Sequence, residues 1–241
     1  MSFTIMKAED YNSMSLLAAK KVIEKIKEQQ NIVLGLATGS TPEGLYRELI
    51  DDHKQNGTSY RNIKTVNLDE YIGLDKTNRN SYKSFMYEKL FQYIDIPPEH
   101  THIPNGIADD PVREAERYDK LIEQLGGVDL QILGIGHNGH IGFNEPGTSF
   151  SSRTHIVKLE NSTRMANSRL FNKVDEVPSQ AITMGISSIL ESKEILLLAS
   201  GSAKAPAIKH LLSEDVSENF PASALKLHKN VTIIADSAAL K

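Results

Sequence analysis

The most informative segment for the fold is Asn31-Ile-Val-Leu-Gly-Leu-Ala-Thr-Gly-Ser-Thr-Pro42. Its first half is a continuous apolar run, which is typical of a strand buried on both faces in a parallel sheet. Its second half holds a glycine and three hydroxyl residues and leads to Pro42. A proline there indicates the start of a helix, because the first turn of a helix needs no N–H partner at that position. The segment therefore predicts a buried strand that turns directly into a helix.

On either side of this segment, helical and strand-like patterns alternate along the chain. Apolar residues at helical spacing lie on one side of the preceding segment, at Met14, Leu17, Ala18, Val22 and Ile26. Further buried strands are expected at 63–68, 128–135, 194–200 and 231–236, and helices around 81–93, 111–125 and 202–212. This alternation predicts an α/β, Rossmann-like fold, with a mostly parallel sheet, helices on both faces and a single domain over residues 1–241.

The composition narrows the class of protein. An apolar fraction of 39% and a charged fraction of 24% are ordinary for a globular protein with a real core. The net charge of −4 argues against nucleic acid as the main partner. The absence of cysteine excludes disulfides, thiolate metal sites and a thiol nucleophile. No signal-like N-terminus and no apolar run near ~20 residues is present. We therefore expect no membrane partner and a cytoplasmic location.

Two strand-to-helix corners favour a phosphate. In open α/β sheets, ligands bind beyond the carboxyl ends of the strands. Thr38, Gly39, Ser40 and Thr41 combine free backbone N–H groups with the positive end of a helix dipole, although a plain Thr41 N-cap is the alternative. Lys204 is expected in the first turn of a later helix, where the dipole disfavours a cation unless an anion is bound. One phosphate held between the two corners explains both, whereas a solvated lysine on the helix shoulder is the alternative for Lys204.

The segment richest in chemistry is Gly134-Ile-Gly-His-Asn-Gly-His-Ile-Gly-Phe-Asn-Glu-Pro-Gly147. Its glycines and proline indicate a constrained loop that holds polar side chains in place. His140 can accept and return a proton near neutral pH, and Glu145 can orient its ring and stabilise the imidazolium. Asp69 follows the strand at 63–68 and is expected at the mouth of the sheet. For Asp69 alone, a solvated turn carboxylate is the simpler interpretation.

Two other interpretations of this loop have to be weighed. Gly134-x-Gly136-x-x-Gly139 matches the dinucleotide fingerprint, but that fingerprint needs a long helix, which the following glycines and proline would break. His137, His140 and Glu145 are candidate metal ligands. A His-x-x-His pair on an irregular loop is, however, a weak ligand signal compared with His-Glu-x-x-His on a helix. Neither interpretation is favoured.

Together these segments resemble glucosamine-6-phosphate deaminases of the short bacterial form. The resemblance covers nearly the whole chain, and the loop motif ending in Phe-Asn-Glu-Pro-Gly147 is highly specific. The matching segments, in the order and spacing of that family, are Gly35-Leu-Ala-Thr-Gly-Ser-Thr-Pro42, Asn67-Leu-Asp-Glu-Tyr-Ile-Gly-Leu74, the loop at 134–147, Thr163-Arg-Met-Ala-Asn-Ser-Arg169 and Gly201-Ser-Ala-Lys204.

The resemblance implies an enzyme that converts D-glucosamine 6-phosphate and water to D-fructose 6-phosphate and ammonium. It implies that His140 assists opening of the sugar ring, that Asn138 and Glu145 form its relay, and that Asp69 moves a proton from C2 toward C1. The larger enzymes of the family carry Asp at the position of Asn138. A neutral amide can orient the imidazole but cannot stabilise its charge as a carboxylate would.

The same resemblance implies which residues hold the substrate phosphate and whether a cofactor is required. It assigns the phosphate to the corner at Thr38, Gly39, Ser40 and Thr41, with Arg169 and Lys204. Arg169 would not be chosen from its local sequence, because an arginine on a helix is usually solvated. No metal and no organic cofactor are implied.

Two alternative functions have to be separated from this one. A 6-phosphogluconolactonase has a related fold and a Gly-x-x-Gly-His loop, but its histidine precedes a Ser-Leu-Phe-Pro type segment. In this chain His140 precedes Ile-Gly-Phe-Asn-Glu-Pro. A catalytically silent sugar-phosphate sensor would need the phosphate corners but not Asp69, His140 and Glu145 together.

The resemblance also bears on assembly and regulation. Larger family members are hexamers activated by N-acetylglucosamine 6-phosphate, which binds partly to an arginine and a lysine after a Ser-Arg-Thr segment. Here His155 and Val157 occupy those positions, and Lys158 would face the opposite side of a strand. The chain also ends soon after Asp236, without the extension that completes the activator site in the larger forms. We therefore expect a monomer with hyperbolic kinetics.

Overall fold

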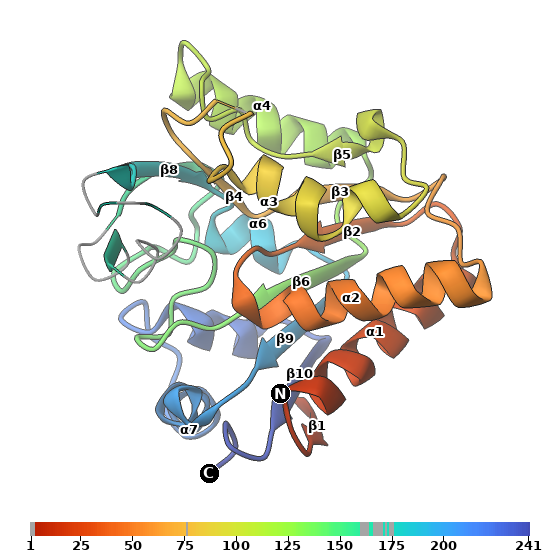
Figure 1. Cartoon of the computed structure of the whole chain (residues 1–241). Coiled ribbons are helices and arrows are strands. Elements are labelled where there is room, and N and C mark those ends of the chain that lie inside the picture. The colour runs from red at the N-terminus through yellow and green to blue at the C-terminus, as the bar shows by residue number, and fades with distance from the viewer. Residues whose placement is uncertain (1–2, 76, 160–163, 166–170, 172, 174–175) are drawn as a thin grey trace.

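The computed structural model describes residues 3–75, 77–159, 164–165, 171, 173 and 176–241 (Figure 1). Its centre is a seven-stranded sheet in which every neighbouring pair is parallel. In spatial order its strands are β1 (Thr4–Ala8), β10 (Val231–Asp236), β9 (Glu194–Ala199), β6 (Leu130–Gly134), β2 (Val33–Leu36), β3 (Lys64–Asn67) and β5 (Thr101–His102). The predicted α/β fold with a mostly parallel sheet is confirmed.

A second, antiparallel sheet was not predicted. Its strands, in spatial order, are β4 (Asp69–Tyr71), β8 (Gln180–Thr183) and β7 (His155–Lys158). Only Leu68 separates β4 from β3, so one extended segment passes from the large sheet to the small one. These strands have three or four residues each, which is too short for a periodic pattern to be recognised in the sequence.

Helices cover both faces of the large sheet, as predicted. The predicted helix at 81–93 is an α-helix followed by a 3₁₀ turn, and the one at 202–212 begins as a 3₁₀ turn. The α-helices whose bounds lie within the described ranges are α1 (Tyr11–Glu28), α2 (Ser40–Asn56), α3 (Tyr82–Lys89), α4 (Pro111–Gln124), α6 (Ile186–Leu190) and α7 (Ala205–Ser213). The 3₁₀ turns described in full are η1 (Phe91–Tyr93), η2 (Pro98–His100), η5 (Ser202–Lys204) and η6 (Pro221–Leu227).

The alternation of side chains along the central strands separates two apolar layers. Successive residues of a strand point to opposite faces, and β9 shows this clearly. Leu197 packs in one cluster with Leu211 of α7, whereas Leu198 packs in the other with Val22 of α1. Each large apolar side chain buried in this way stabilises the fold by about 1.5–3 kcal/mol relative to an exposed position. The sheet is thus held rigidly from both sides.

The strand order contains the reversal at which open α/β proteins bind ligands. From β2 the chain continues to β3 and β5 on one side, and β6, β9 and β10 then fill the other side. The direction of winding therefore changes between β2 and β6, and the crevice at the carboxyl ends of these two strands is the expected ligand site. The corner at Gly39 and the loop at 134–147 both begin at this crevice.

The N-terminal strand closes one edge of the large sheet. β1 pairs with β10 in parallel, with Thr4 opposite Thr232 and Ala8 opposite Asp236. Most of β1 is exposed, which explains why its apolar pattern gave no strand prediction. β1 is thus an edge strand paired with a strand from the other end of the chain.

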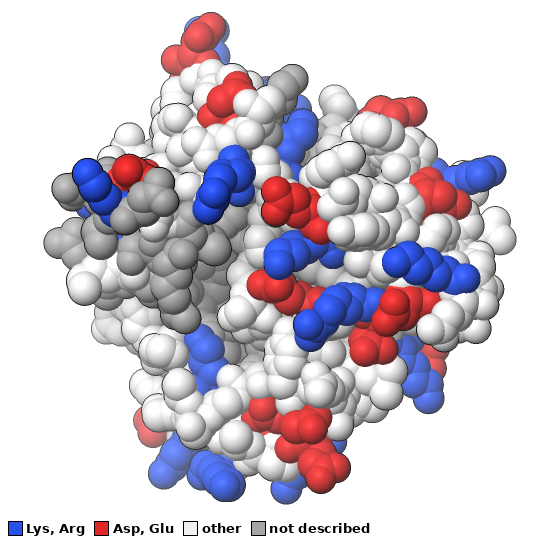
Figure 2. Space-filling model, in the orientation of Figure 1, with Lys and Arg blue, Asp and Glu red and all other residues white. Residues whose placement is uncertain are grey.

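Charges of both signs are interspersed on the surface. On the face drawn in Figure 2, basic and acidic side chains alternate over the described residues instead of gathering into one basic area. Within the described ranges, no helix combines the length and apolar character that crossing a bilayer requires.

Candidate active site

The corner after β2 presents backbone groups without a side-chain cap. Gly39 has φ 94° and is the N-cap of α2, and among the described residues no side chain caps this helix by a hydrogen bond. The alternative in which Thr41 is the N-cap is therefore wrong, because Thr41 and Pro42 both lie within the first turn. Glycine adopts this φ without strain. The Tyr46 hydroxyl donates to the Ala37 carbonyl and anchors the end of β2.

Thr38 is connected to an aromatic cluster that sequence reasoning missed. Its side chain lies close enough to Tyr82 of α3 to influence the pKa of that phenol, and the Tyr82 hydroxyl lies 3.2 Å from that of Tyr71. The ring of Phe143 stacks with the Tyr82 ring at an interplanar angle of 15°. These aromatics come from three separate segments, so no local sequence signal links them. They form an apolar wall beside the crevice.

Asp69 is buried and close to a second carboxylate. It begins β4, opposite Thr183 of β8, and only 6% of it is exposed. Burial, and then the charge of Glu70, raise the pKa of Asp69 to about 8. Glu70 itself accepts hydrogen bonds from the N–H groups of Tyr82 and Lys83, at 3.0 Å each, and so caps the start of α3. The interpretation of Asp69 as a solvated turn carboxylate is therefore wrong.

The loop after β6 is built on close contacts that require glycine. A Cβ on Gly136 would lie 2.2 Å from ring atoms of His140, so the imidazole packs over bare backbone. Gly139 has φ 82°, and a Cβ there would lie 2.4 Å from the ring of Phe220. Residues 135–154 form turns and contain no helix, so the dinucleotide-fingerprint interpretation is wrong.

His140, Asn138 and Glu145 form a connected relay. Asn138 Nδ2 donates to Glu145 Oε2 at 2.6 Å, and His140 Nδ1 lies 2.7 Å from Asn138 Oδ1 and 3.5 Å from Glu145 Oε1. Because the carboxylate can only accept, it directs the amide nitrogen toward itself and the amide oxygen toward the imidazole. The tautomer of His140 that fits these contacts carries its proton on Nδ1 and leaves the lone pair on Nε2.

The same loop lies against Asp69. A Cβ on Gly142 would lie 3.5 Å from Asp69 Oδ2. Both segments contact β8, because Asp69 pairs with Thr183 and the Phe143 N–H donates to Thr183 Oγ1 at 3.1 Å. The structure therefore brings Asp69 together with the His140 relay through a strand that lies far from both in the sequence.

Lys204 belongs to a second corner on the other side of β6. Gly201 has φ 90°, and its N–H donates to the Asp236 carboxylate at 3.0 Å. Lys204 ends the η5 turn and is the N-cap residue of α7, one step before the helix in which it was predicted. Partial burial lowers the pKa of Lys204, and its charge is the main cause of a lowered pKa at His137. Lys204 is therefore partly buried and lies near His137 of the loop at 134–147.

The two corners border a common hollow. Its volume is about 400 Å³, and it is lined by Tyr11, Ser40, Thr41, Glu43, Arg47 and Ser200. Ser40 and Thr41 come from the Gly39 corner, and Ser200 directly precedes Gly201. Arg169 lies outside the described residues, so the structure says nothing of its position.

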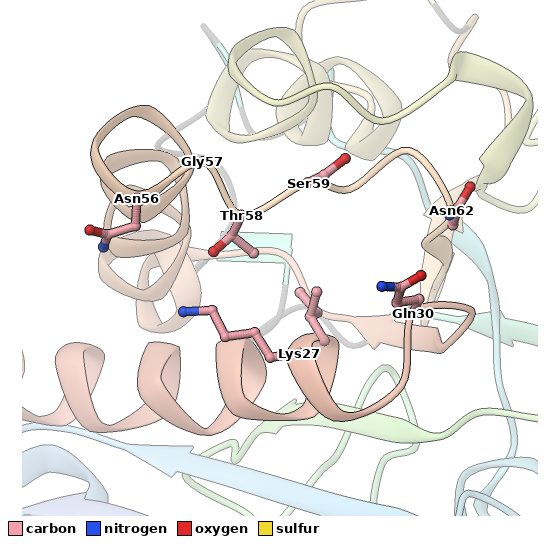
Figure 3. A pocket seen from close by; sticks show the side chains of 8 residues that line it. Lys27, Gln30, Asn56, Gly57, Thr58, Ser59 and Asn62 are labelled. Atoms are coloured by element: carbon pink, nitrogen blue, oxygen red, sulfur yellow. The ribbon is translucent and has the colours of Figure 1, made fainter.

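Other hollows lie away from these residues. One of about 390 Å³ lies beside the starts of β2 and β3, at the opposite edge of the sheet, and none of the predicted site residues lines it (Figure 3). Its lining includes Lys27, Gln30, Asn56 and Asn62. In the described part of the chain, no group of three or more His, Asp or Glu side chains is arranged to hold a metal ion.

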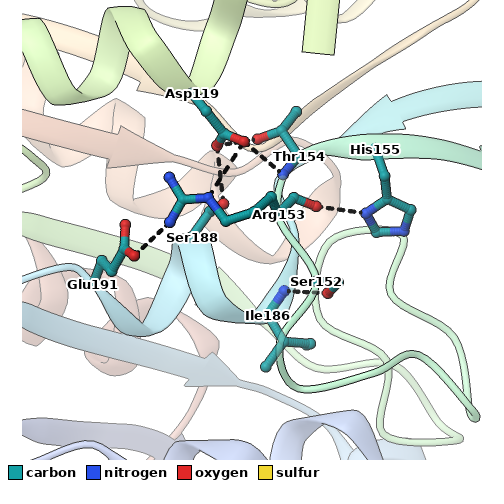
Figure 4. A network of polar contacts seen from close by, with 8 residues as sticks. All are labelled: Asp119, Ser152, Arg153, Thr154, His155, Ile186, Ser188 and Glu191. Carbon is teal, nitrogen blue, oxygen red and sulfur yellow. Dashed lines mark hydrogen bonds and ion pairs between the residues drawn. The ribbon is translucent and has the colours of Figure 1, made fainter. Parts of the chain in front are cut away.

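Arg153 is engaged by two carboxylates of the same chain. Arg153 Nε lies 3.5 Å from Asp119 Oδ2, and its Nη1 forms an ion pair with Glu191 (Figure 4). Asp119 also accepts hydrogen bonds from the Thr154 N–H and hydroxyl, at 3.0 and 2.7 Å. His155 begins β7, so Lys158 lies on a strand. Arg153 and Thr154, which follow Ser152, are thus held by carboxylates of the same chain.

Comparison with known proteins identifies the family. The model of the family described as glucosamine-6-phosphate isomerases/6-phosphogluconolactonase matches residues 7–234. The chain belongs to this family. A glucosamine-6-phosphate deaminase of Geobacillus sp. (strain WCH70) is 58% identical over 236 residues, which are 98% of this chain and 94% of the relative. The family predicted from the sequence motifs is therefore confirmed.

Solved structures agree with this membership. That of a monomeric glucosamine-6-phosphate deaminase superposes with a TM-score of 0.97 at 53% identity, and covers 99% of this chain and 100% of the other. The structure of 6-phosphogluconolactonase from Trypanosoma brucei gives a TM-score of 0.80 at 19% identity, over 99% of this chain and 97% of the other. At that identity the likeness concerns the fold alone.

Proposed function

We propose that this chain converts D-glucosamine 6-phosphate and water to D-fructose 6-phosphate and ammonium. The observation that carries the proposal is the meeting of a buried carboxylate, Asp69, with the relay of His140, Asn138 and Glu145 at one edge of the sheet. Relatives named for this activity, at up to 58% identity over nearly the whole chain, support it.

The first step is the opening of the sugar ring by His140. With Nδ1 protonated and hydrogen-bonded to Asn138, the Nε2 lone pair accepts the proton of the anomeric hydroxyl. The ring C–O bond then breaks, and the imidazolium returns a proton to the ring oxygen. Glu145 stabilises the transient charge from 3.5 Å while Asn138 keeps the imidazole oriented.

The second step is the transfer of a proton from C2 to C1 by Asp69. The open-chain aldehyde makes the C2 hydrogen acidic, and Asp69 removes it; the C1 oxygen takes up a proton from the substrate's own ammonium group, so that a neutral enolamine forms. Returning the proton to C1 gives a C2 imine, and water adds to C2 before ammonium leaves. Because burial raises the pKa of Asp69 to about 8, its carboxylate is a stronger base than an ordinary one.

The phosphate is assigned to the hollow between the two corners. The uncapped N–H groups and hydroxyls of Ser40 and Thr41, which line this hollow, supply neutral donors. Lys204 of the second corner is assigned as the cation, although it does not itself line the hollow. Arg169 is proposed as a second cation on the strength of the sequence motif alone. A cation and a helix N-terminus together select a dianion over a neutral hydroxymethyl group.

The lactonase alternative is less well supported. Ester hydrolysis needs no base positioned for a C–H proton, yet Asp69 is buried against the loop that carries His140. The likeness to a lactonase structure is at 19% identity, compared with 53% for the deaminase structure. We therefore place the lactonase second and the silent sensor third.

We also propose a monomer without an activator site, located in the cytoplasm. Arg153 is the cationic residue directly after Ser152. Its guanidinium already forms ion pairs with Asp119 and Glu191. A phosphate would have to displace these carboxylates at a cost in ion-pair energy. The similar deaminase of known structure is monomeric, which agrees with this proposal.

One assay tests the function. Purified protein is given glucosamine 6-phosphate, and fructose 6-phosphate and ammonium are measured together; 6-phosphogluconolactone is the control substrate. Equimolar release of the two products supports the proposal. Hydrolysis of the lactone without deamination would establish the alternative, and binding without turnover of either substrate would establish a sensor.

A further inference from the structure

A tyrosine from α1 reaches into the first turn of α2. The Tyr11 hydroxyl donates to the Ser40 carbonyl at 2.8 Å and accepts from the Gly44 N–H at 2.7 Å. Ser40 and Gly44 are four residues apart, so they carry the two groups that a hydrogen bond of an α-helix joins. The Tyr11 hydroxyl thus bridges a backbone donor and acceptor at the start of α2, directly beside the Gly39 corner.

The contact depends on a close approach of the two helices. α1 and α2 lie side by side (Figure 1). A Cβ on Gly44 would lie 2.1 Å from Ser15 Oγ and 3.0 Å from Tyr11 Cε1, so glycine is what allows the approach. Ser15 Oγ donates to the Tyr11 carbonyl at 2.8 Å and fixes the same turn of α1.

The hydrogen bond to Ser40 sets the direction of a donor for the phosphate. The peptide unit is planar, so the Ser40 carbonyl and the Thr41 N–H are fixed together and point in opposite directions. By holding the carbonyl, Tyr11 orients the Thr41 N–H. Tyr11, Ser40 and Thr41 also line the hollow of about 400 Å³ between the two corners.

We propose that Tyr11 is a positioning residue for the substrate phosphate, acting through the Ser40–Thr41 peptide. This inference rests on the proposed function, because it takes the Gly39 corner as the phosphate site. Tyr11 touches no reacting atom, so its role is expected in substrate affinity and not in the rate of the chemical steps.

The test is Tyr11→Phe, with Tyr87→Phe as the matched control at an exposed tyrosine of α3. Losing one net hydrogen bond should raise KM for glucosamine 6-phosphate and Ki for inorganic phosphate by about three- to tenfold. The kcat should change by less than about twofold, since binding alone is affected. A fall in kcat at unchanged KM, or the same rise in Tyr87→Phe, would overturn the inference.

A second variant guards against a general loss of structure. Gly44→Ala places a methyl group against Ser15 and Tyr11 and so separates the two helices without removing the Tyr11 hydroxyl. It should raise Ki for inorganic phosphate as Tyr11→Phe does, and an unchanged Ki would contradict the proposal. If the wild-type protein does not deaminate glucosamine 6-phosphate, the proposed function fails. Inorganic phosphate binding, measured by calorimetry, would then still decide the role of Tyr11.

Discussion

The two regions to which the proposed mechanism assigns acid–base roles are built in opposite ways. Asp69 belongs to a strand, is 6% exposed and is fixed by pairing with Thr183. His140 belongs to a glycine-rich loop, has a side chain 31% exposed and is aligned by neighbouring side chains. In the proposed mechanism the strand residue moves a carbon-bound proton and the loop residue moves oxygen-bound protons. The harder proton transfer is thus assigned to the drier and more rigid region.

Asp69→Asn should cause the greatest loss of activity. The amide keeps the shape but cannot accept the C2 proton, so kcat should fall by about 10²–10⁴-fold. Binding of inorganic phosphate should stay at the wild-type level. Asp109→Asn, at an exposed position, is the control. Exchange of the C2 hydrogen with solvent deuterium at the normal rate in Asp69→Asn would refute the role of Asp69.

His140→Asn should have the smaller effect of the two. Sugar rings also open slowly without a catalyst, so kcat should fall by only about 10²-fold, the lower end for a lost acid–base group. His137→Asn, in the same loop, should change kcat little. All three variants are compared in one steady-state assay. A larger loss in His140→Asn than in Asp69→Asn would reverse the assignment of the harder step.

Because Asp69 is buried, we expect its ionised form, which the proposed reaction needs, to lower the stability of the folded protein. Its pKa is raised from 3.8 to about 8, so the native protein holds this proton at pH values where the unfolded chain has lost it. The contribution of Asp69 to stability is therefore full below about pH 4 and is lost as the pH rises through about 8. Asp69→Asn should raise the melting temperature by several degrees at pH 8–9 and by less at pH 5–6. A melting-temperature difference that is independent of pH would contradict this.

Asn138→Asp, in the loop that carries His140, should have the smallest effect on activity. In this variant a second carboxylate lies beside Glu145 and His140, and it stabilises the imidazolium. The acid limb of the kcat/KM profile should therefore move to higher pH, while the rate above neutrality changes by only about a fewfold. Asn62→Asp, at the opposite edge of the sheet, is the control. An unchanged profile would show that the amide and the carboxylate are equivalent here.

The parts of the fold with a continuous apolar pattern were predictable from sequence. β2, β6, β9 and β10 are buried on both faces, so each one forms an apolar run within one or two residues of its predicted bounds. β1 is mostly exposed and β5 has two residues, so neither has such a pattern. The small antiparallel sheet depends on pairing between β4 and β8, which are far apart in sequence.

In the candidate site, too, local sequence patterns were predictive, whereas contacts between distant segments were not. The polar residues of the loop at 134–147 were found because glycines and catalytic residue types are adjacent in sequence. The burial of Asp69 was not foreseen, because β8 and the loop cover it from distant segments. Tyr11 was not selected for the same reason, since its partner turn begins 29 residues later.

The pairing of β1 with β10 bears on how the chain folds while it is being synthesised. Thr4 leaves the ribosome early, but its partner Thr232 emerges only when nearly all of the described chain has been made. Until then β1 exposes unpaired backbone groups, and the sheet cannot acquire its final edge. This edge of the sheet is therefore completed late, and a nascent chain stalled before Val231 should remain sensitive to proteolysis in β1.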